Sequence, residues 1–302
     1  MLSNIPKNAK KILDEMSIER IRGASYLAEK CLDFYIALVK GSLPIEEIER
    51  ISREVIKLFP SVAPVYNISN TVLKFLRDSK GLGSVLKDLE RYKLEIKSAK
   101  ARIAETFLER IDVGERPVII THSYSSVVLE TVKKLVSSRI VPKVILTESR
   151  PDYEGIHFAY ELKKLGVNYE IITDAQIGLV VREADIAVVG ADCIARNLDV
   201  INKAGTFLLA LSARYYDVPF YVLAESFKLH PKARRGLDIK LMERELIVKG
   251  LHVRNILFDV TPNRLVTAIL TENSIMKPIL RYSWKILAHR RCFCGRNRVS
   301  QT

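Results

Sequence analysis

Five short apolar runs in the second half of the chain are each followed by polar or charged side chains that could carry chemistry. The runs are PVIITH, KVILTE, YEIITD, IAVVGAD and FYVLAES. The groups that follow them include Ser123, Glu148, Asp174, Asp192 and Glu225. In open parallel sheets, ligands bind beyond the carboxyl ends of the strands. Reactive groups at five consecutive strand ends therefore predict a shared pocket rather than a purely structural sheet.

The first of these strand ends has the composition of an anion site. Ser123, Tyr124, Ser125 and Ser126 open a predicted helix, where hydroxyls and free backbone N–H groups attract negative charge. Glu148 follows the next run at about the distance at which an acidic residue holds a ribose hydroxyl. The first turn lacks the Gly-x-Gly-x-x-Gly pattern that lets a backbone approach a pyrophosphate. A sugar phosphate or a mononucleotide is expected as ligand, and no dinucleotide or other cofactor.

These groups are positioned by an alternation of strands and helices that begins after Gly114. Each run has four to six residues and is apolar on both faces, as in strands covered by helices on both sides. A sixth run, NILFDV, extends the series. Strand–helix alternation repeated five or six times predicts a doubly wound, Rossmann-like parallel sheet.

The first 110 residues follow a helical pattern instead. Apolar residues recur at spacings of three and four from Ile12 to Cys31 and again from Ile45 to Leu58. Pro60 and Pro64 interrupt the pattern, and residues 85–111 contain no Gly or Pro and predict one long linking helix. The expected α/β organisation is a helical N-terminal domain at residues 1–110, the Rossmann-like domain at 111–280 and a tail at 281–302.

Composition limits the class of protein. The 302 residues hold no apolar run of the roughly 18 residues needed to cross a bilayer. The N-terminus lacks the apolar core of a signal peptide, and four cysteines are too few and too scattered for a disulfide framework. These features predict a soluble, cytoplasmic protein that contacts no membrane. Two glutamines beside 83 ionised residues are a bias typical of proteins from hot environments.

The net charge of +13 is unevenly distributed. The last 22 residues carry six basic and no acidic side chains, so the rest of the chain is only mildly basic. The tail is interpreted as a solvated extension or, alternatively, as a basic arm that contacts RNA or an acidic protein. Cys292 and Cys294 lie in this tail, but no second pair or histidine cluster completes a metal site. No metal is expected.

Several blocks resemble a known family. They are THSYSSVVLETV, LTESRPDYEG, GADCIARN, INKAGTFLLALSARYYDVPFYVLAESFK and FDVTP, and the similarity spans roughly residues 16–278. They look like the alpha, beta and delta subunits of translation initiation factor 2B, a family that also contains methylthioribose-1-phosphate isomerase and ribose-1,5-bisphosphate isomerase. The resemblance implies a helical domain on a Rossmann-like domain, and dimers or higher assemblies.

The isomerases of this family use a Cys as general base and an Asp as general acid. The resemblance places the acid at Asp192, but Ser123 stands where the Cys is expected. A serine hydroxyl without activation is a far poorer base than a thiolate. Phe59 stands where the isomerases have an Arg that holds phosphate. Both departures argue against isomerase activity, and the THSYS block is similar to the initiation-factor branch.

The resemblance also implies that the binding residues are retained. Arg22, Gly23, Ala24 and Ser25 match the phosphate loop of the isomerases. The remaining matches are the pair Asn202 and Lys203, and Lys228. Arg22 and Lys203 would bind phosphate, while Asp192 and Glu148 would accept hydrogen bonds from sugar hydroxyls.

The first hypothesis is therefore a non-catalytic, archaeal-type regulatory homologue that binds a sugar phosphate or a nucleoside monophosphate between its domains. It would self-associate through residues 202–278, with initiation factor 2 as its partner by family analogy. The alternative is a ribose-1,5-bisphosphate type isomerase with Asp192 as acid and an atypical base. RNA binding through the tail is a third possibility.

Other residues leave two interpretations open. His122 is a pocket residue or bonds a backbone carbonyl, and Asp192 has a structural alternative as a cap. Cys31 and Cys193 are expected to be core thiols. The aromatic residues after Lys203, which are Phe207, Tyr215 and Tyr216, are expected in an interface or core rather than stacked on a nucleobase.

Overall fold

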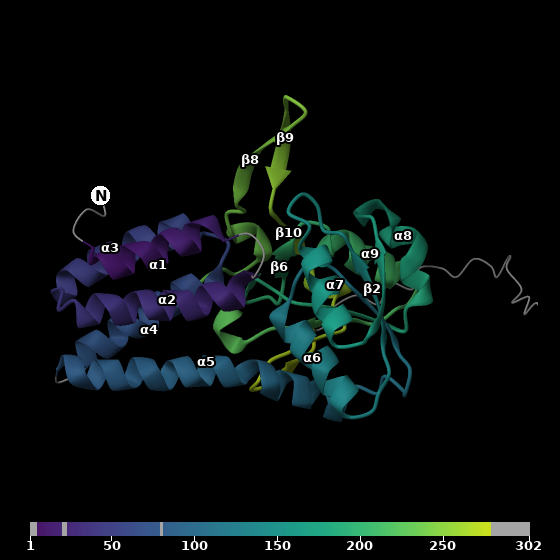
Figure 1. The fold of residues 1–302 in the computed structure, drawn as a ribbon, viewed down its shortest axis with the longest axis horizontal. Helices are drawn as coiled ribbons and strands as arrows, with labels where there is room; N and C mark the ends of the chain where they lie inside the picture. The colour runs from purple at the N-terminus through teal and green to yellow at the C-terminus, as the bar shows by residue number, and fades with distance from the viewer. Residues whose placement is uncertain (1–4, 20–22, 79–80, 279–302) are drawn as a thin grey trace, which may run out of the picture.

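The computed structural model describes residues 5–19, 23–78 and 81–278. Its N-terminal part is a bundle of five helices, called the helical layer below because it lies against one end of the sheet (Figure 1). They are α1 (Lys7–Ile18), α2 (Gly23–Lys40), α3 (Ile45–Leu58), α4 (Ala63–Asp78) and α5 (Leu82–Arg110). The predicted helix from Ile45 to Leu58 is confirmed as α3, and Pro64 lies in the first turn of α4, where its missing N–H costs nothing.

The amphipathic pattern accounts for how these helices pack. In α3, Ile48, Ile51 and Val55 share one face at spacings of three and four and are fully buried. The same face carries buried Ser52, whose hydroxyl donates to the carbonyl of Ile48 at 2.7 Å. The helices thus enclose a core of their own.

The C-terminal part contains a seven-stranded sheet in the order β12-β11-β7-β4-β1-β2-β3. Its strands are β1 (Val118–Thr121), β2 (Lys143–Thr147), β3 (Asn168–Ile172), β4 (Ile186–Val189), β7 (Phe220–Leu223), β11 (Ala268–Leu270) and β12 (Ile275–Met276). All neighbours pair in parallel except β12, which is antiparallel to β11. The chain reverses its direction across the sheet between β1 and β4, which is where ligands bind in doubly wound folds.

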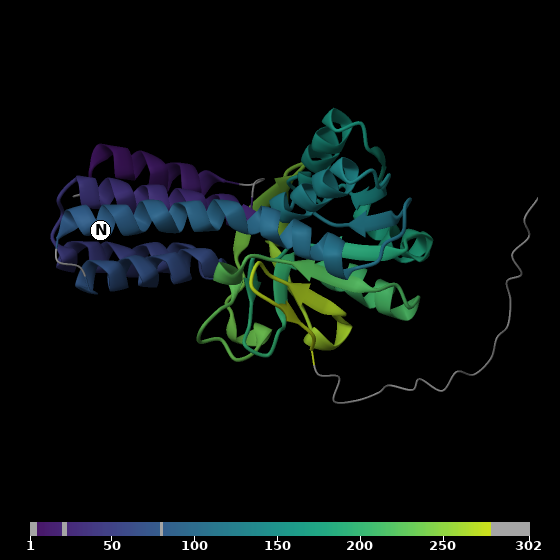
Figure 2. The ribbon, with the colours of Figure 1, turned by 90° about the horizontal axis from the view of Figure 1, so that it is seen from below.

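Helices cover both faces of this sheet, as the apolar strands predict. Side chains alternate along β1, so Ile119 packs with α5, α6 (Ser126–Ser137) and α7 (Glu154–Lys164), whereas Ile120 packs with α8 (Ile177–Val180) and α9 (Thr206–Tyr215). Helix α5 runs from the helical layer onto the sheet domain (Figure 2). The predicted fold class, a helical N-terminal region followed by a Rossmann-like sheet, is confirmed.

The sixth apolar run is not a strand of the parallel sheet, so this detail of the prediction was wrong. NILFDV is divided between the end of β9 (Leu251–Ile256) and β10 (Phe258–Thr261). Strand β10 pairs antiparallel with β6 (Val200–Lys203) in a separate three-stranded sheet that also contains β5 (Cys193–Ile194). The sixth parallel strand is β11, which has only three residues.

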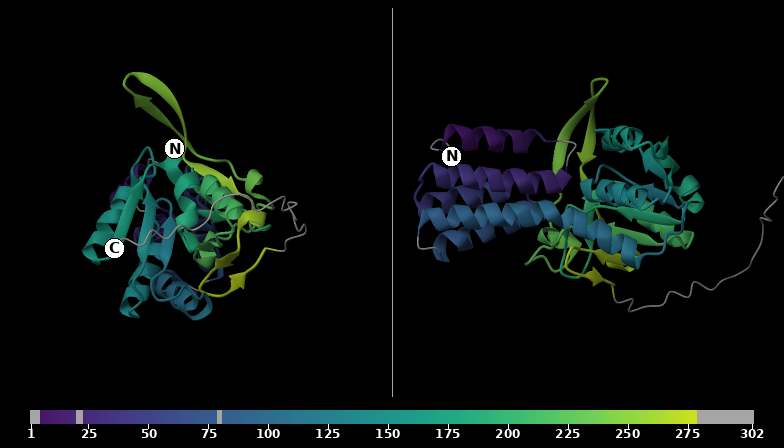
Figure 3. Two further views of the ribbon diagram at one scale, coloured as in Figure 1. Left: turned by 90° about the vertical axis from the view of Figure 1, so that its right-hand side faces the viewer. Right: turned by 60° about the horizontal axis from the view of Figure 1, so that its bottom comes forward.

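A two-stranded hairpin projects from the junction of the two parts (Figures 1 and 3). It consists of β8 (Glu243–Val248) and β9, which among the described residues pair only with each other. The apolar side chains Ile247, Leu251 and Val253 on it are exposed. The base of the hairpin lies beside the switch point of the parallel sheet and contributes to the site described next.

Candidate functional site

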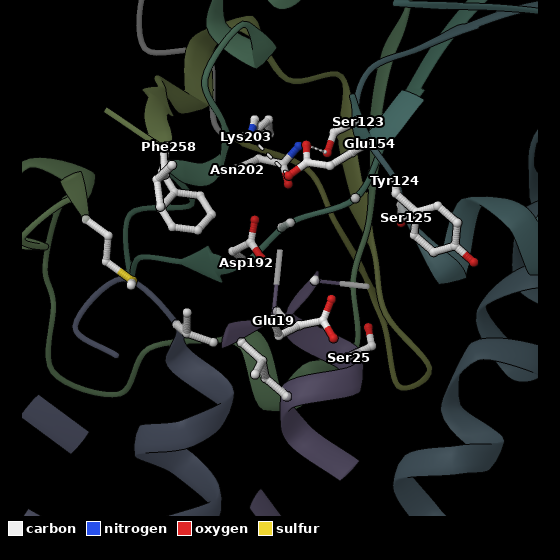
Figure 4. Close-up of a pocket in the computed structure, with 18 of the residues that line it drawn as sticks. Glu19, Ser25, Ser123, Tyr124, Ser125, Glu154, Asp192, Asn202, Lys203 and Phe258 are labelled. Atoms are coloured by element: carbon white, nitrogen blue, oxygen red, sulfur yellow. Dashed lines mark hydrogen bonds and ion pairs between the residues drawn. The ribbon is translucent and has the colours of Figure 1, made fainter. Parts of the chain in front are cut away.

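A cavity of about 820 Å³ of atom-free space, part of it open to solvent, lies where the helices meet the carboxyl ends of the strands (Figure 4). Its wall comes from α2, from the turns after β1 and β4, from β6 and from the base of the hairpin. The predicted residues that line it are Gly23, Ala24, Ser25, Ser123, Tyr124, Ser125, Ser126, Asp192, Asn202, Lys203 and Lys228. The fold therefore brings together residues from five separate segments of the sequence.

Two helices begin at this cavity. Helix α2 begins at Gly23, whose φ of +68° is in the left-handed region. Helix α6 begins at Ser126, and the side chain of Ser125 caps it by accepting from the N–H of Val128 at 3.4 Å. A Cβ at Gly190 would lie 2.5 Å from the Ser125 hydroxyl, so only glycine allows this turn to approach. The positive ends of two helix dipoles make the cavity suitable for an anion.

Lys203 forms the centre of a buried ionic cluster. Its Nζ lies 3.0 Å from Oε1 of Glu154 and 3.5 Å from Oδ2 of Asp152. The Ser123 hydroxyl donates to the other oxygen of Glu154 at 2.8 Å. Burial raises the pKa of Glu154 to about 7, although the charge of Lys203 opposes the shift. This carboxyl group therefore exchanges its proton near neutral pH.

Asp192 projects into the middle of the cavity, between Ser25 on one side and Asn202 and Lys203 on the other (Figure 4). Burial raises its pKa to about 6, against the opposing charges of Lys228 and Lys203. The backbone amide of Ala24, in the first turn of α2, also stabilises the ionised form. Asp192 can thus accept a hydrogen bond as a carboxylate or supply a proton as an acid.

A second buried ion pair lies at the end of β7 and is hydrogen-bonded to the helical part through Ser25. Nζ of Lys228 lies 2.8 Å from Oε2 of Glu225, and the Ser25 hydroxyl donates to Oε1 of Glu225 at 2.7 Å. Burial alone would raise the pKa of Glu225, but Lys228 and Ser25 lower it below its usual value. Glu225 is therefore a stable anion that fixes the first turn of α2 against the end of β7.

Some predicted groups lie elsewhere. Arg22 is outside the described residues. Glu148 does not line the cavity. Asp174 accepts from the backbone N–H groups of Ser149 and Arg150 at 3.0 and 2.8 Å, so it fixes the loop after β2. These positions show that the five strand ends do not all share one pocket.

His122 bonds a backbone carbonyl, which resolves its two interpretations. Its Nε2 donates to the carbonyl of Ala204 at 2.9 Å, and its Nδ1 lies 2.6 Å from the Thr147 hydroxyl. Burial lowers the pKa of His122 to about 4, so the ring is neutral near pH 7. Gly205 leaves the room for this ring, since a Cβ there would lie 2.7 Å from it.

The two cysteines of the described residues are core thiols, as predicted. Cys31 and Cys193 are fully buried and unpaired. Burial raises the pKa of each thiol to about 12. Neither thiol supplies the thiolate that the position of Ser123 lacks.

The sequence interpretation missed several residues of the cavity. Glu154 is the most important of them, and the glycine that follows it is the feature of the sequence that could have indicated its position. A Cβ at Gly155 would lie 1.7 Å from the carbonyl oxygen of Thr147, so α7 begins in direct contact with the end of β2 and turns Glu154 inward. The other missed residues are Glu19, Asp152, Met242, Arg244 and Phe258, while Phe59 contributes an apolar wall.

The sequence predicts neither a membrane-spanning helix nor a metal site, and the described part of the chain bears on both. There, no helix is both long and apolar enough to span a bilayer. The same residues hold no group of three or more His, Cys, Asp or Glu side chains arranged for a metal ion. Cys292 and Cys294, with the rest of the basic tail, lie outside them.

Fold and site together define a two-part α/β protein whose polar cavity lies between a helical layer and the switch point of a Rossmann-like sheet. Residues 21–278 match the model of the initiation factor 2 subunit family. The chain belongs to this family.

Some relatives of this chain are named as initiation factor subunits and others as isomerases. The chain is 44% identical to a putative translation initiation factor eIF-2B subunit 2-like protein of Pyrococcus horikoshii, over 91% of this chain and 98% of the relative. It is 32% identical to a ribose 1,5-bisphosphate isomerase of Methanocaldococcus jannaschii, over 92% and 94% of the two chains. The crystal structure of a translation initiation factor eIF-2B of Pyrococcus horikoshii OT3 superposes with a TM-score of 0.84 at 43% identity, covering 91% of this chain and 98% of the other.

Proposed function

We propose that this protein is a regulatory subunit of the initiation factor 2B type that binds a sugar phosphate or a nucleoside monophosphate without converting it. The observation that carries the proposal is the meeting of two helix N-termini with Lys203 and Lys228 in one cavity. Helix N-termini and lysines are each common phosphate-binding elements in proteins. Both lysines also pair with carboxylates, so a bound phosphate would share Lys203 with Glu154 and Lys228 with Glu225.

The ligand is oriented by the arrangement of charges. Its phosphate lies at the first turns of α2 and α6, within reach of Lys203. Arg22 precedes α2 and is proposed as a further phosphate ligand. Asp192 and Glu154 accept hydrogen bonds from the sugar hydroxyls, and Glu154 takes the role that the sequence assigned to Glu148.

The hydrogen bond of Ser123 supports the proposal that the protein does not convert its ligand. Its hydroxyl donates to Glu154, which leaves no base of the strength of a thiolate at that position. A cavity that keeps its phosphate binders and lacks this base is suited to sensing a metabolite.

One observation favours isomerisation as a second candidate. Glu154 and Asp192 are two carboxyl groups of one cavity whose pKa values, about 7 and about 6, lie near neutral pH. With a sugar 1-phosphate, Asp192 would protonate the ring oxygen as the ring opens while Glu154 removes the proton from C2, which gives an enol. Glu154 would then return its proton to C1 while Asp192 takes the proton of the C2 hydroxyl, which leaves the C2 ketone and restores both carboxyl groups.

Binding and turnover separate the two candidates. Ribose 5-phosphate or AMP is expected to raise the melting temperature, and Lys203→Ala should remove this shift while Lys134→Ala, on the surface of α6, keeps it. Absence of any shift in the wild type would refute ligand binding. Incubation with ribose 1,5-bisphosphate should give no ribulose product, whereas turnover that Asp192→Asn abolishes would establish the isomerase.

Self-association is proposed through the α8–α9 side of the sheet domain. Leu208, Leu211 and Tyr215 are 55%, 47% and 79% exposed and share one face of α9, and Leu179 on α8 is 68% exposed. Exposed apolar side chains in such a cluster favour a protein interface. Family membership makes initiation factor 2 the proposed partner of the assembly, and pull-down with purified initiation factor 2 tests it.

A further inference from the structure

Three neighbouring loops of the sheet domain gather basic side chains outside the cavity. They comprise residues 195–199, 230–240 and 262–265, and are called the basic loops below. The N–H of Arg196 donates to the carbonyl of Ala233 at 2.9 Å, so the first two loops lie side by side. The exposed basic residues of the three loops are Arg196, Lys232, Arg234, Arg235, Lys240 and Arg264.

The two acidic residues of the basic loops bind backbone N–H groups. Asp199 accepts from the N–H groups of Gly236 and Asn263 at 3.0 and 2.9 Å, so it ties the three loops together. Asp238 accepts from two N–H groups of its own loop at 2.9 and 2.8 Å. Among the described residues, the six basic side chains form a single ion pair, in which Arg235 lies 3.9 Å from Asp238. Most of their charge is therefore available to a ligand.

A groove between α4, α5 and the sheet domain opens beside the basic loops. It encloses about 1430 Å³ of atom-free space, part of it open to solvent. Among the described residues it shares no lining side chain with the cavity. Uncharged polar and aromatic side chains, including Tyr66, Asn70, Tyr92 and Asn273, form much of its lining. Such groups stack on nucleobases or form hydrogen bonds with their edges.

Tyr66 joins this groove to the basic loops. Its ring stacks on His230 with 5.0 Å between ring centroids and 25° between the planes. Nζ of Lys232 lies 5.6 Å from the centre of the same ring. Pro231, between these two residues in the sequence, also lines the groove. A chain molecule that leaves the groove at Tyr66 therefore passes directly onto the basic loops.

The composition of the basic loops favours a phosphate chain over a protein partner. Four of their six basic residues are arginines, whose planar guanidinium group matches the geometry of a phosphate. Protein interfaces have an apolar core, whereas Leu237 is the one large hydrophobic side chain exposed in these fully described loops. We propose that the basic loops and the groove bind single-stranded nucleic acid, with phosphates on the loops and bases in the groove. This site is separate from the cavity and does not depend on the ligand proposed there.

Fluorescence anisotropy of the full-length protein with a labelled oligouridine of about 20 nucleotides tests this site. For single strands, each phosphate contact contributes about −0.7 to the slope of log affinity against log salt concentration. The triple variant Arg196→Ala/Arg234→Ala/Arg264→Ala should therefore flatten the slope by about 2. This change corresponds to about a hundredfold loss of affinity at about 0.1 M salt if the two lines meet at about 1 M.

A matched triple variant controls for the loss of charge. Arg53→Ala/Arg116→Ala/Arg182→Ala removes three exposed arginines from other parts of the surface and should keep the affinity within about threefold. An arginine triple in the basic loops that binds like the wild type would overturn the proposal, even if the wild type binds through its tail. Equal losses in the two triple variants would overturn it as well, because binding would then follow net charge alone.

The stacking position and the kind of strand are tested in the same assay. Tyr66→Ala should weaken binding about tenfold without changing the salt slope, because it removes an aromatic surface and no charge. Tyr66→Phe should keep the affinity, and unchanged binding by Tyr66→Ala would overturn the placement of the bases. Oligodeoxythymidine of the same length should bind within about tenfold of the RNA, since both strands offer phosphates and base faces. A larger preference for either strand would overturn this mode of recognition.

Discussion

Glu154→Gln should remove one component of the pH dependence of folding. The amide keeps the size of the side chain and can still accept from Ser123. The pKa of Glu154 is about 7 in the folded protein, against 4.5 for an ordinary glutamate. The folded state therefore binds this proton more tightly, and its contribution to stability, complete below pH 4.5, is lost as the pH rises through 7. At about 1.4 kcal/mol per pKa unit, the loss is about 3 kcal/mol.

Urea unfolding between pH 5 and 8 measures this effect in both proteins. The free energy of unfolding of the wild type minus that of Glu154→Gln should fall by about 2 to 3 kcal/mol over this range. Taking the difference cancels the titration of Asp192 and His122, which both proteins share. Glu148→Gln changes the same group outside the cavity and is the matched control. Parallel profiles for wild type and Glu154→Gln would refute the reasoning.

Three further predictions concern packing, a buried histidine and assembly. Gly155→Ala should destabilise the protein by about 3 kcal/mol or more in urea unfolding, because its Cβ would lie 1.7 Å from the Thr147 carbonyl oxygen. Gly178→Ala, whose Cβ meets nothing nearer than 3.8 Å, should cost nothing, and equal losses would contradict the argument. Because the pKa of His122 is lowered to about 4, the wild type should lose up to about 3 kcal/mol as the pH falls from 6.5 to 4. His122→Gln should lose less over that range, and an identical acid profile would exclude this role. Leu208→Glu should reduce the mass measured by light scattering, whereas an unchanged mass would exclude this face from the interface.

Elements with a local pattern could be predicted from the sequence. In α3 the buried residues recur at spacings of three and four, and β1, β2, β4 and β7 are apolar runs. Each of these patterns can be recognised within its own segment without knowledge of the rest of the chain. The run NILFDV carries the same local pattern, yet its partner is β6, because pairing depends on the whole chain. Strand β11 has three residues, too few for any periodicity.

The candidate site was predictable where residues sit directly at strand ends or in the matched blocks. Ser123, Asp192 and Lys203 are such residues. Glu154 could not be found in this way, because the close contact between Gly155 and the end of β2 turns it inward. Likewise, Glu148 follows its strand directly but does not line the cavity. Its position in the sequence could not show this, because it does not indicate on which side of the loop the side chain lies.

Helix α5 makes the two parts of the molecule one cooperative unit. Val85 and Leu89 are buried in the core of the helical layer, whereas Ile103 and Phe107 are buried under the sheet. A fragment that begins after residue 110 would expose the apolar surface that these last two side chains cover. Melting of either core removes packing from the same helix, so a single unfolding transition is expected for both. A ligand that binds only to residues of the sheet domain would thus also protect the N-terminal helices from proteolysis.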